Sequence, residues 1–181
     1  MYPAVFLDRD GVIIKNRPTC VRTWDDVEII PDVLPALTRM TSRPYKIVII
    51  TNQSAVARGL ISLRATENIN QRLTDTIKKA GGRIDGIFMC PHKPDDNCEC
   101  RKPRPGLIFQ AADTLTLDLK RSILIGDALT DLQAGLNAGV GKIALVLTGR
   151  GLQQAQSLEV QQMKPFPVFD NLAQALDALY E

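Results

Sequence analysis

The stretch AVFLDRDG, residues 4–11, decides how this sequence is expected to fold. Four apolar residues, Ala4–Leu7, form a short continuous run, which is typical of a strand covered on both faces. Asp8 and Asp10 follow directly, where such a strand would end. In open parallel sheets, ligands bind beyond the carboxyl ends of the strands. The stretch therefore predicts a buried strand that carries two carboxylates to a binding site.

Short apolar runs recur along the chain and alternate with segments of helical spacing. The further predicted strands are residues 47–50, 86–89, 123–125, 143–147 and 167–169. The predicted helices are residues 33–40, 63–79, 107–115, 129–138 and 172–180, with Gly139 as a C-cap and Asn171 as an N-cap. This alternation predicts an α/β fold, a doubly wound, Rossmann-like parallel sheet with helices on both faces and no large cap domain.

The composition excludes several classes of partner. The length of 181 residues fits a single domain over residues 1–181, and 22 lysines and arginines nearly balance 20 aspartates and glutamates. No broad basic surface for nucleic acid is therefore expected.

The first apolar run is too short for a signal peptide, and no stretch approaches the roughly 20 apolar residues of a membrane span. We expect a cytoplasmic protein without a membrane partner; the sequence gives no sign of an oligomer, and a monomer is assumed.

Polar residues follow the other predicted strands as well. The sequences TNQS at residues 51–54 and GDALTD at residues 126–131 come directly after two of them, and RKP at residues 101–103 ends a loop after a third. Parallel strands end at the same edge of a sheet, so these residues are expected to line one crevice.

The four groups together resemble the signature motifs of haloacid dehalogenase-like phosphatases. These motifs are Asp-x-Asp-Gly at residues 8–11, Thr-Asn at 51–52, Lys-Pro at 102–103 and Gly-Asp-x-x-x-Asp at 126–131. The resemblance extends from Ala4 to about Gly149. It implies a magnesium-dependent phosphoric monoester hydrolase that acts on a small phosphorylated substrate through an aspartyl-phosphate intermediate.

The chemistry of phosphate transfer suits these residue types. A phosphate ester is an anion, so a carboxylate nucleophile needs fixed positive charge beside it. We assign Asp8 as the nucleophile and Asp10 as the general acid and base. Thr51 and Lys102 would stabilise the phosphoryl group. For Thr51, an ordinary turn position is the alternative.

Oxygen ligands for magnesium come from the same motifs. Asp8, the main-chain carbonyl of Asp10 and Asp127 are the expected ligands. Asp131 lies one helical turn after Asp127, where it would orient the metal's waters or pair with Lys102. Its alternative role is to place a negative charge in the first turn of a helix.

Six residues are candidates for substrate binding. They belong to the loops after the first and second motifs and to the segment before Lys102, and a surface role is the alternative for Arg101. The candidates are Arg17, Asn52, Gln53, Ser54, Arg58 and Arg101.

A cysteine cluster predicts a second metal. Cys90, His92, Cys98 and Cys100 supply three thiolates and one imidazole, the complete ligand set of a closed tetrahedral zinc site. The alternative is a group of unrelated side chains. We expect a structural zinc ion that holds the loop of residues 90–105. Cys20 is distant in sequence and is expected to be an ordinary buried residue.

The zinc pattern with CRKP at residues 100–103 resembles the group that contains D-glycero-D-manno-heptose 1,7-bisphosphate phosphatases and histidinol-phosphate phosphatases. Residues 51–59 and 103–106 are more similar to the heptose branch, and the spacing between His92 and Cys98 favours the histidinol branch. We predict heptose 1,7-bisphosphate 7-phosphatase activity. The alternatives are a phosphatase for histidinol phosphate or another small metabolite, a phosphotransferase, and an inactive zinc-stabilised binding module.

Overall fold

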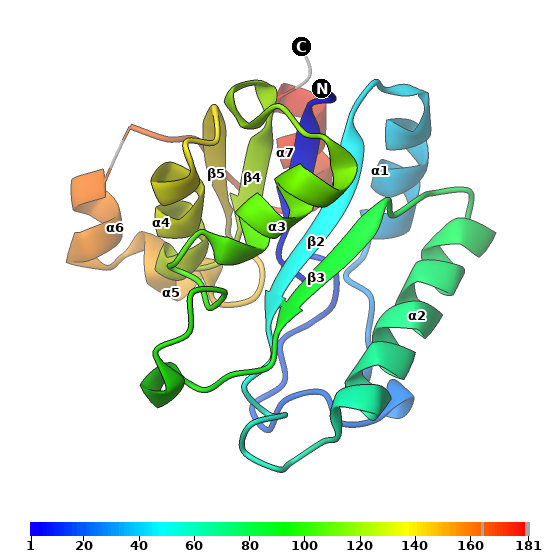
Figure 1. Ribbon diagram of the computed structural model, residues 1–181. Helices are drawn as coiled ribbons and strands as arrows, with labels where there is room; N and C mark the ends of the chain where they lie inside the picture. The colour runs from blue at the N-terminus through cyan, green and yellow to red at the C-terminus, as the bar shows by residue number, and fades with distance from the viewer. Residues whose placement is uncertain (164, 180–181) are drawn as a thin grey trace.

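Six parallel strands form the centre of the molecule, and helices cover both faces of the sheet (Figure 1). The computed structural model describes residues 1–163 and 165–179. The strands are β1 (Ala4–Leu7), β2 (Lys46–Asn52), β3 (Gly86–Cys90), β4 (Ile123–Gly126), β5 (Lys142–Val146) and β6 (Val168–Phe169). Their order is β3-β2-β1-β4-β5-β6, and every neighbouring pair is parallel. The predicted fold class is confirmed.

Seven α-helices connect or follow these strands in the described part of the chain. They are α1 (Val33–Arg39), α2 (Leu63–Lys79), α3 (Gly106–Leu115), α4 (Leu129–Ala138), α5 (Gly151–Ala155), α6 (Leu158–Met163) and α7 (Leu172–Leu179). Every predicted element agrees with the structure to within two residues at each end, except that the predicted end of the last helix, residue 180, lies outside the described residues. No helix in the described ranges has the length and apolar character needed to cross a membrane.

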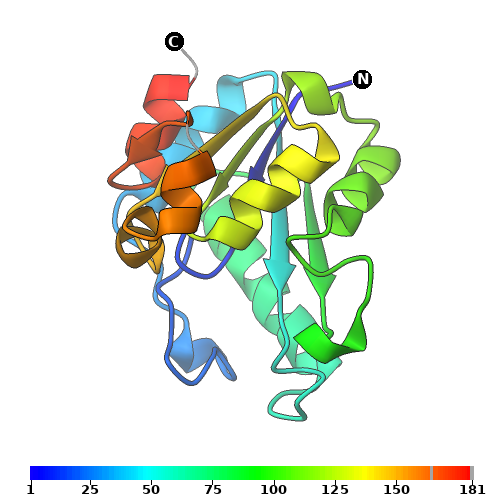
Figure 2. The same cartoon turned by 90° about the vertical axis from the view of Figure 1, so that its left-hand side faces the viewer.

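Side chains of each strand alternate between two apolar cores. In β1, Val5 and Leu7 pack with α1, α2 and α7, whereas Ala4 and Phe6 pack with α3, α4 and α6. Successive strand residues point to opposite faces, so a strand buried on both sides must be apolar throughout. Figure 2 shows α4 and α6 in front of the sheet.

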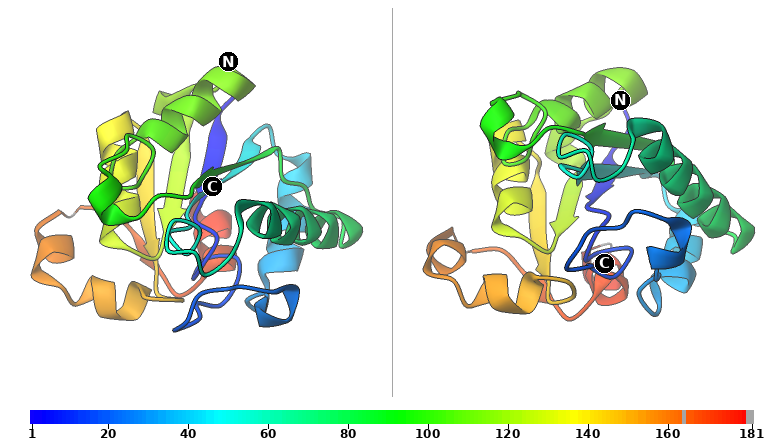
Figure 3. Two further views of the ribbon diagram at one scale, coloured as in Figure 1. Left: turned by 60° about the horizontal axis from the view of Figure 1, so that its bottom comes forward. Right: turned by 90° about the horizontal axis from the view of Figure 1, so that it is seen from below.

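The order of the strands reverses next to β1, which lies between β2 and β4. The chain passes from β1 through β2 to β3 on one side, and from β4 through β5 to β6 on the other. Loops that follow β1, β2 and β3 gather at the carboxyl end of the sheet (Figure 3). Ligand sites of doubly wound sheets lie at this reversal, beyond the strand ends.

Two helices were not predicted. Residues 151–163, which contain α5 and α6, include five glutamines and lack a clear apolar period, and only Gly151 and Val160 of the two helices are buried. The loop of residues 90–105, expected to lack regular structure, begins with the last residue of β3 and contains a short 3-10 helix, Pro94–Asp96.

Both predicted helix caps are confirmed. Gly139 ends α4 with a φ of 72°, a left-handed conformation that glycine adopts without strain. The Asn171 Oδ1 atom accepts a hydrogen bond of 3.0 Å from the Gln174 backbone N–H at the start of α7. The expectation for Cys20 was wrong, because this residue is half-buried and lines the central cavity described below.

Candidate active site

Three carboxylates converge where β1 and β4 end. Asp8 follows β1, Asp127 follows β4, and Asp131 lies in the first turn of α4. Each contributes an oxygen to a cluster whose atoms lie within 4.8 Å of one another, and all three residues are buried. Like charges this close require a cation between or beside them.

Lys102 supplies one such cation. Its Nζ atom lies 2.9 Å from Asp8 Oδ1, 2.7 Å from Asp131 Oδ1 and 2.8 Å from the Ile50 carbonyl oxygen. Burial alone would lower the pKa of Lys102, but the charges of Asp131 and Asp8 outweigh burial and raise it above its ordinary value. The lysine is therefore a fixed positive charge, and the predicted pair with Asp131 is confirmed.

The negative charge of the Asp127 carboxylate is only partly balanced by neighbouring groups. Its Oδ2 atom accepts hydrogen bonds from Asn16 Nδ2 at 2.9 Å and from the Arg150 backbone N–H at 2.8 Å. Among the described residues, its buried Oδ1 atom has no hydrogen-bond partner and forms only a 3.5 Å ion pair with Arg150 Nη2. Burial and the charges of Asp8 and Asp131 raise the pKa of Asp127 to about 7. The free oxygen and the raised pKa are what a bound cation would correct.

Burial is also the main cause of the raised pKa of Asp131, which Asp8 raises further and Lys102 opposes.

Two glycines allow the carboxylates to approach the backbone. A Cβ atom at Gly11 would lie 2.1 Å from Asp127 Oδ2, and one at Gly126 would lie 2.2 Å from the Asp131 Cβ. Any side chain at either position would displace these carboxylates.

Asp10 lies at the edge of the same cleft and is held by three donors. Arg9 donates from Nε at 3.0 Å and from Nη2 at 3.2 Å, and Gln53 donates from Nε2 at 2.8 Å. The Gln53 amide also donates to Thr51 Oγ1 at 2.8 Å. Gln53 therefore links two of the predicted catalytic side chains.

Asn52 is bound to the backbone of Lys102. Its Nδ2 atom donates to the Lys102 carbonyl and its Oδ1 atom accepts from the Lys102 N–H, both at 3.1 Å. This double contact joins the end of β2 to the loop that carries the lysine. Because the Lys102 backbone is fixed, its long and flexible side chain can reach only a limited region of the site.

An open cavity of about 470 Å³ lies above these residues. It is lined by predicted residues and by several that were not predicted. The lining residues are Asp8, Asp10, Asn16, Arg17, Pro18, Cys20, Asn52, Gln53, Ser54, Ala55, Lys102, Thr130, Asp131 and Arg150.

Two of the predicted substrate-binding residues do not line this cavity. Arg101 donates from Nη1 to the His92 carbonyl at 3.1 Å and borders a smaller cavity beside Cys98 and Pro103. Arg58 is exposed on the loop after β2. A substrate role for either arginine stays a prediction.

Asn16 and Arg150 were missed by the sequence analysis. Arg150 follows β5 by four residues, so it carries the same signal as the other site residues, a polar side chain beyond a strand end. Asn16 lies beyond the apolar turn of residues 12–14, and no local pattern distinguishes it. Its contact with Asp127 depends on tertiary folding.

The predicted zinc ligands come together at the end of β3. The Sγ atoms of Cys90 and Cys98 lie 3.6 Å apart, those of Cys98 and Cys100 lie 3.5 Å apart, and His92 Nδ1 lies 3.3 Å from Cys100 Sγ. A tetrahedral ion about 2.3 Å from each sulfur separates two sulfurs by roughly 3.8 Å. The spacing of the four donors therefore fits a zinc ion, and Nδ1 is the His92 atom that lies beside the sulfurs.

A family model and curated relatives match this sequence. A family model described as HAD-hydrolase-like matches residues 99–175. The D-glycero-beta-D-manno-heptose-1,7-bisphosphate 7-phosphatase of Pseudomonas aeruginosa is 34% identical over 181 residues, covering 98% of this chain and 97% of that protein. The enzyme of the same name from Helicobacter pylori J99 is 41% identical over 155 residues, covering 85% and 88%.

A solved structure agrees over nearly the whole length. The crystal structure of D,D-heptose 1,7-bisphosphate phosphatase from B. bronchiseptica, complexed with magnesium and phosphate, has a TM-score of 0.90 and 36% identity and covers 98% of both chains. The fold is that of the haloacid dehalogenase-like phosphatases. Within that class, the chain belongs to the family of D-glycero-beta-D-manno-heptose-1,7-bisphosphate 7-phosphatases.

Proposed function

We propose that this protein hydrolyses the 7-phosphate of a heptose 1,7-bisphosphate through a phosphorylated Asp8. The observation that carries the proposal is the position of Asp8 in the cleft at the strand reversal, 2.9 Å from the buried Lys102 Nζ and beside Asp127. The names of the relatives support the substrate.

In the first step, a carboxylate oxygen of Asp8 attacks phosphorus and the bond from phosphorus to the ester oxygen breaks. Asp10 donates its proton to that oxygen, which leaves as the alcohol. In the second step, Asp10 takes a proton from water, the water oxygen attacks phosphorus, and the bond to Asp8 breaks. Inorganic phosphate leaves and both carboxyl groups return to their starting states.

Fixed donors surround the transferred group. Lys102 stabilises the charge that develops on the phosphoryl oxygens, since its position is set by Asp8, Asp131 and the Ile50 carbonyl. Thr51 is oriented by Gln53, and its hydroxyl can donate to a phosphoryl oxygen.

Magnesium suits the remaining oxygens. Asp8, Asp127 and the main-chain carbonyl of Asp10 would hold it, and Asp131 would orient its waters while paired with Lys102. The fit is supported by the unbonded Asp127 Oδ1 atom and by the pKa of Asp127, raised to about 7. When bound, the ion supplies charge neutralisation at the carboxylates and the phosphate.

Zinc would occupy the closed Cys90, His92, Cys98 and Cys100 site in a structural role. The Lys102 backbone follows this cluster by two residues, so an ordered loop keeps the lysine in place. The chain's other expected properties, a monomeric state and a cytoplasmic location, remain proposals.

The non-reacting phosphate needs a cation at the cavity wall. Arg17 and Arg150 are the arginines that line the cavity among the described residues. Arg17 already contacts the Asp26 carbonyl and Glu28, which fixes its direction. We assign the second phosphate to these two arginines, since guanidinium binds phosphate with two parallel hydrogen bonds.

We expect Arg17→Ala and Arg150→Ala each to lower kcat/KM for heptose 1,7-bisphosphate by about tenfold or more, and to lower it less for a sugar monophosphate. Arg121→Ala is the matched control, because Arg121 is an exposed arginine outside the cavity. An equal loss on both substrates, or an equally large loss in the control, would contradict this assignment.

The substrate itself is tested by comparing kcat/KM for heptose 1,7-bisphosphate, histidinol phosphate and sugar monophosphates with magnesium present. We expect the bisphosphate to be preferred by more than about tenfold, or ~1.4 kcal/mol of transition-state binding, because the second phosphate adds binding energy outside the reacting group. A smaller preference would contradict the assignment of heptose 1,7-bisphosphate as the substrate, but it would not contradict the proposed phosphatase chemistry.

A further inference from the structure

Arg9 is a buried arginine next to the cleft that the reaction as described above does not use. It is among the largest fully buried side chains of the protein, with 1% of its surface exposed. Its Nε and Nη2 atoms bind Asp10, and its Nη1 atom donates to Asn70 Oδ1 at 2.8 Å. A buried ion pair is in general no more stabilising than well-packed apolar residues. The contact between Arg9 and Asp10 therefore calls for a role in the cleft.

Asn70 reaches this arginine from a different element. It lies in the middle of α2, is itself 6% exposed, and does not line the active-site cavity. The guanidinium is planar, so partners on two sides fix both its position and its plane. Without the Asn70 acceptor, the Arg9 Nη1 atom would lose its partner, and the guanidinium group of Arg9 could turn away from Asp10.

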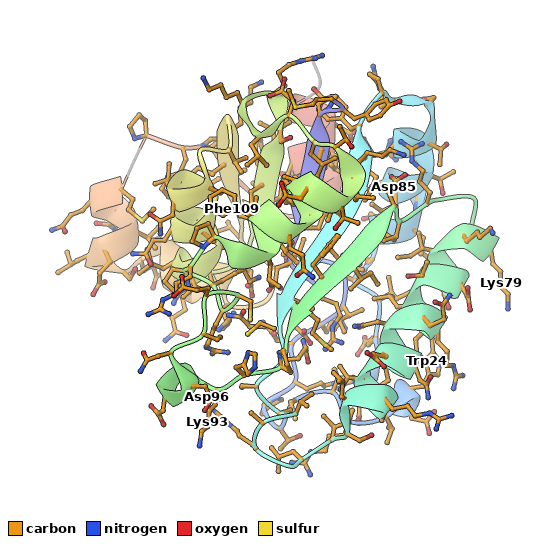
Figure 4. All side chains as sticks on the ribbon, viewed as in Figure 1. Trp24, Lys79, Asp85, Lys93, Asp96 and Phe109 are labelled. Atoms are coloured by element: carbon orange, nitrogen blue, oxygen red, sulfur yellow. The ribbon has the colours of Figure 1, made fainter. Side chains whose placement is uncertain are left out.

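Helix α2 is a firm support for Asn70. Ser62 caps its N-terminus, where Oγ accepts from the Ala65 N–H at 3.1 Å, and its Ile69 and Leu73 side chains are buried in the core. Arg72 stacks over the Trp24 ring at 4.7 Å, which joins the helix to the loop that precedes α1. Trp24 lies beside α2 in Figure 4.

We infer that Asn70 is a positioning residue that acts through Arg9 to aim the Asp10 carboxyl group at the ester oxygen of the substrate. This inference rests on the proposed function, in which Asp10 protonates the leaving alcohol. General acid catalysis requires the acid within hydrogen-bond reach of the oxygen that it protonates. Arg9 and Gln53, from two separate segments of the chain, both bind Asp10, and Asn70 keeps Arg9 in place.

The inference predicts a dependence on the leaving group. A weakly basic leaving group departs with little help from an acid, whereas a more basic one needs the proton. Asn70→Ala should lower kcat/KM for phenyl phosphate about tenfold more than for p-nitrophenyl phosphate, two substrates of similar shape. Arg9→Lys, which keeps the charge and loses the planar fork, should show the same bias and serves if Asn70→Ala fails to fold.

Two further variants make the test specific. Asp10→Asn sets the bias expected when the acid is lost, and Thr74→Ala is the control on the same helix, since it removes only the 3.1 Å hydrogen bond to the Asn70 carbonyl. Thr74→Ala should affect both substrates equally. If Asp10→Asn shows the bias and both Asn70→Ala and Arg9→Lys do not, the inference is overturned while the proposed function stands. If the unaltered protein with magnesium hydrolyses neither aryl phosphate nor the heptose bisphosphate, the proposed function falls and the inference with it.

Discussion

Asp8→Asn is expected to fold normally and to lose nearly all phosphatase activity. An amide cannot attack phosphorus, and it removes the negative oxygen that pairs with Lys102 Nζ at 2.9 Å. We expect kcat to fall below about a hundredth of the unaltered value, because a covalent nucleophile supplies several kcal/mol of barrier lowering. The measurement is steady-state turnover of an aryl phosphate with saturating magnesium.

The control for this variant is its thermal unfolding. In this variant Lys102 keeps its 2.7 Å ion pair with Asp131, and loss of the Asp8 charge relieves repulsion with Asp127 and Asp131, so Tm should not fall. A folded Asp8→Asn protein that keeps more than about a hundredth of the activity would remove Asp8 from the nucleophile role.

Loss of the zinc site is expected to have the second large effect. The purified protein should contain one tightly held zinc per chain, distinct from exchangeable magnesium, because four donors with separations of 3.3 to 3.6 Å close the site completely. Cys98→Ser should lower the free energy of unfolding by at least about 2 kcal/mol, or ~5 °C in Tm, since metal binding is coupled to folding. Activity should fall with it, because Lys102 follows the last expected zinc ligand, Cys100, by two residues.

Cys20→Ser is the matched control, since Cys20 lies outside the cluster. It should leave the zinc content unchanged in metal analysis of freshly purified, reduced protein. Absence of zinc from the unaltered protein would contradict the zinc assignment, as would a Cys98→Ser protein with full zinc content and an unchanged Tm.

The sequence predicted best where element ends are chemically marked. The bounds of β1, α2 and α4 were predicted without error. Asp8 ends the first apolar run and Gly139 ends α4, and the structure shows that Ser62 caps α2. Helices α5 and α6 were missed because their sequences carry little apolar pattern. Their position is set by packing against the sheet.

The site was predictable to the extent that it follows strand ends. Asp8 and Asp131 meet because β1 and β4 are neighbours in the sheet, and Lys102 reaches them from the loop after β3, where Asn52 at the end of β2 binds its backbone. The contact from Asn70 to Arg9 was not predictable, since it depends on how close α2 packs to the loop after β1. No local sequence pattern in α2 or in the loop after β1 indicates how close the two segments lie.

The most direct test of the account is to trap the intermediate. The protein is mixed with substrate and magnesium, quenched during turnover, reduced with borohydride, which converts an acyl phosphate to an alcohol, and digested for mass spectrometry. The account predicts homoserine at position 8, only when substrate is present, and none in Asp8→Asn. Modification of another carboxylate such as Asp10 or Asp127, or no modification while substrate is being hydrolysed, would contradict it.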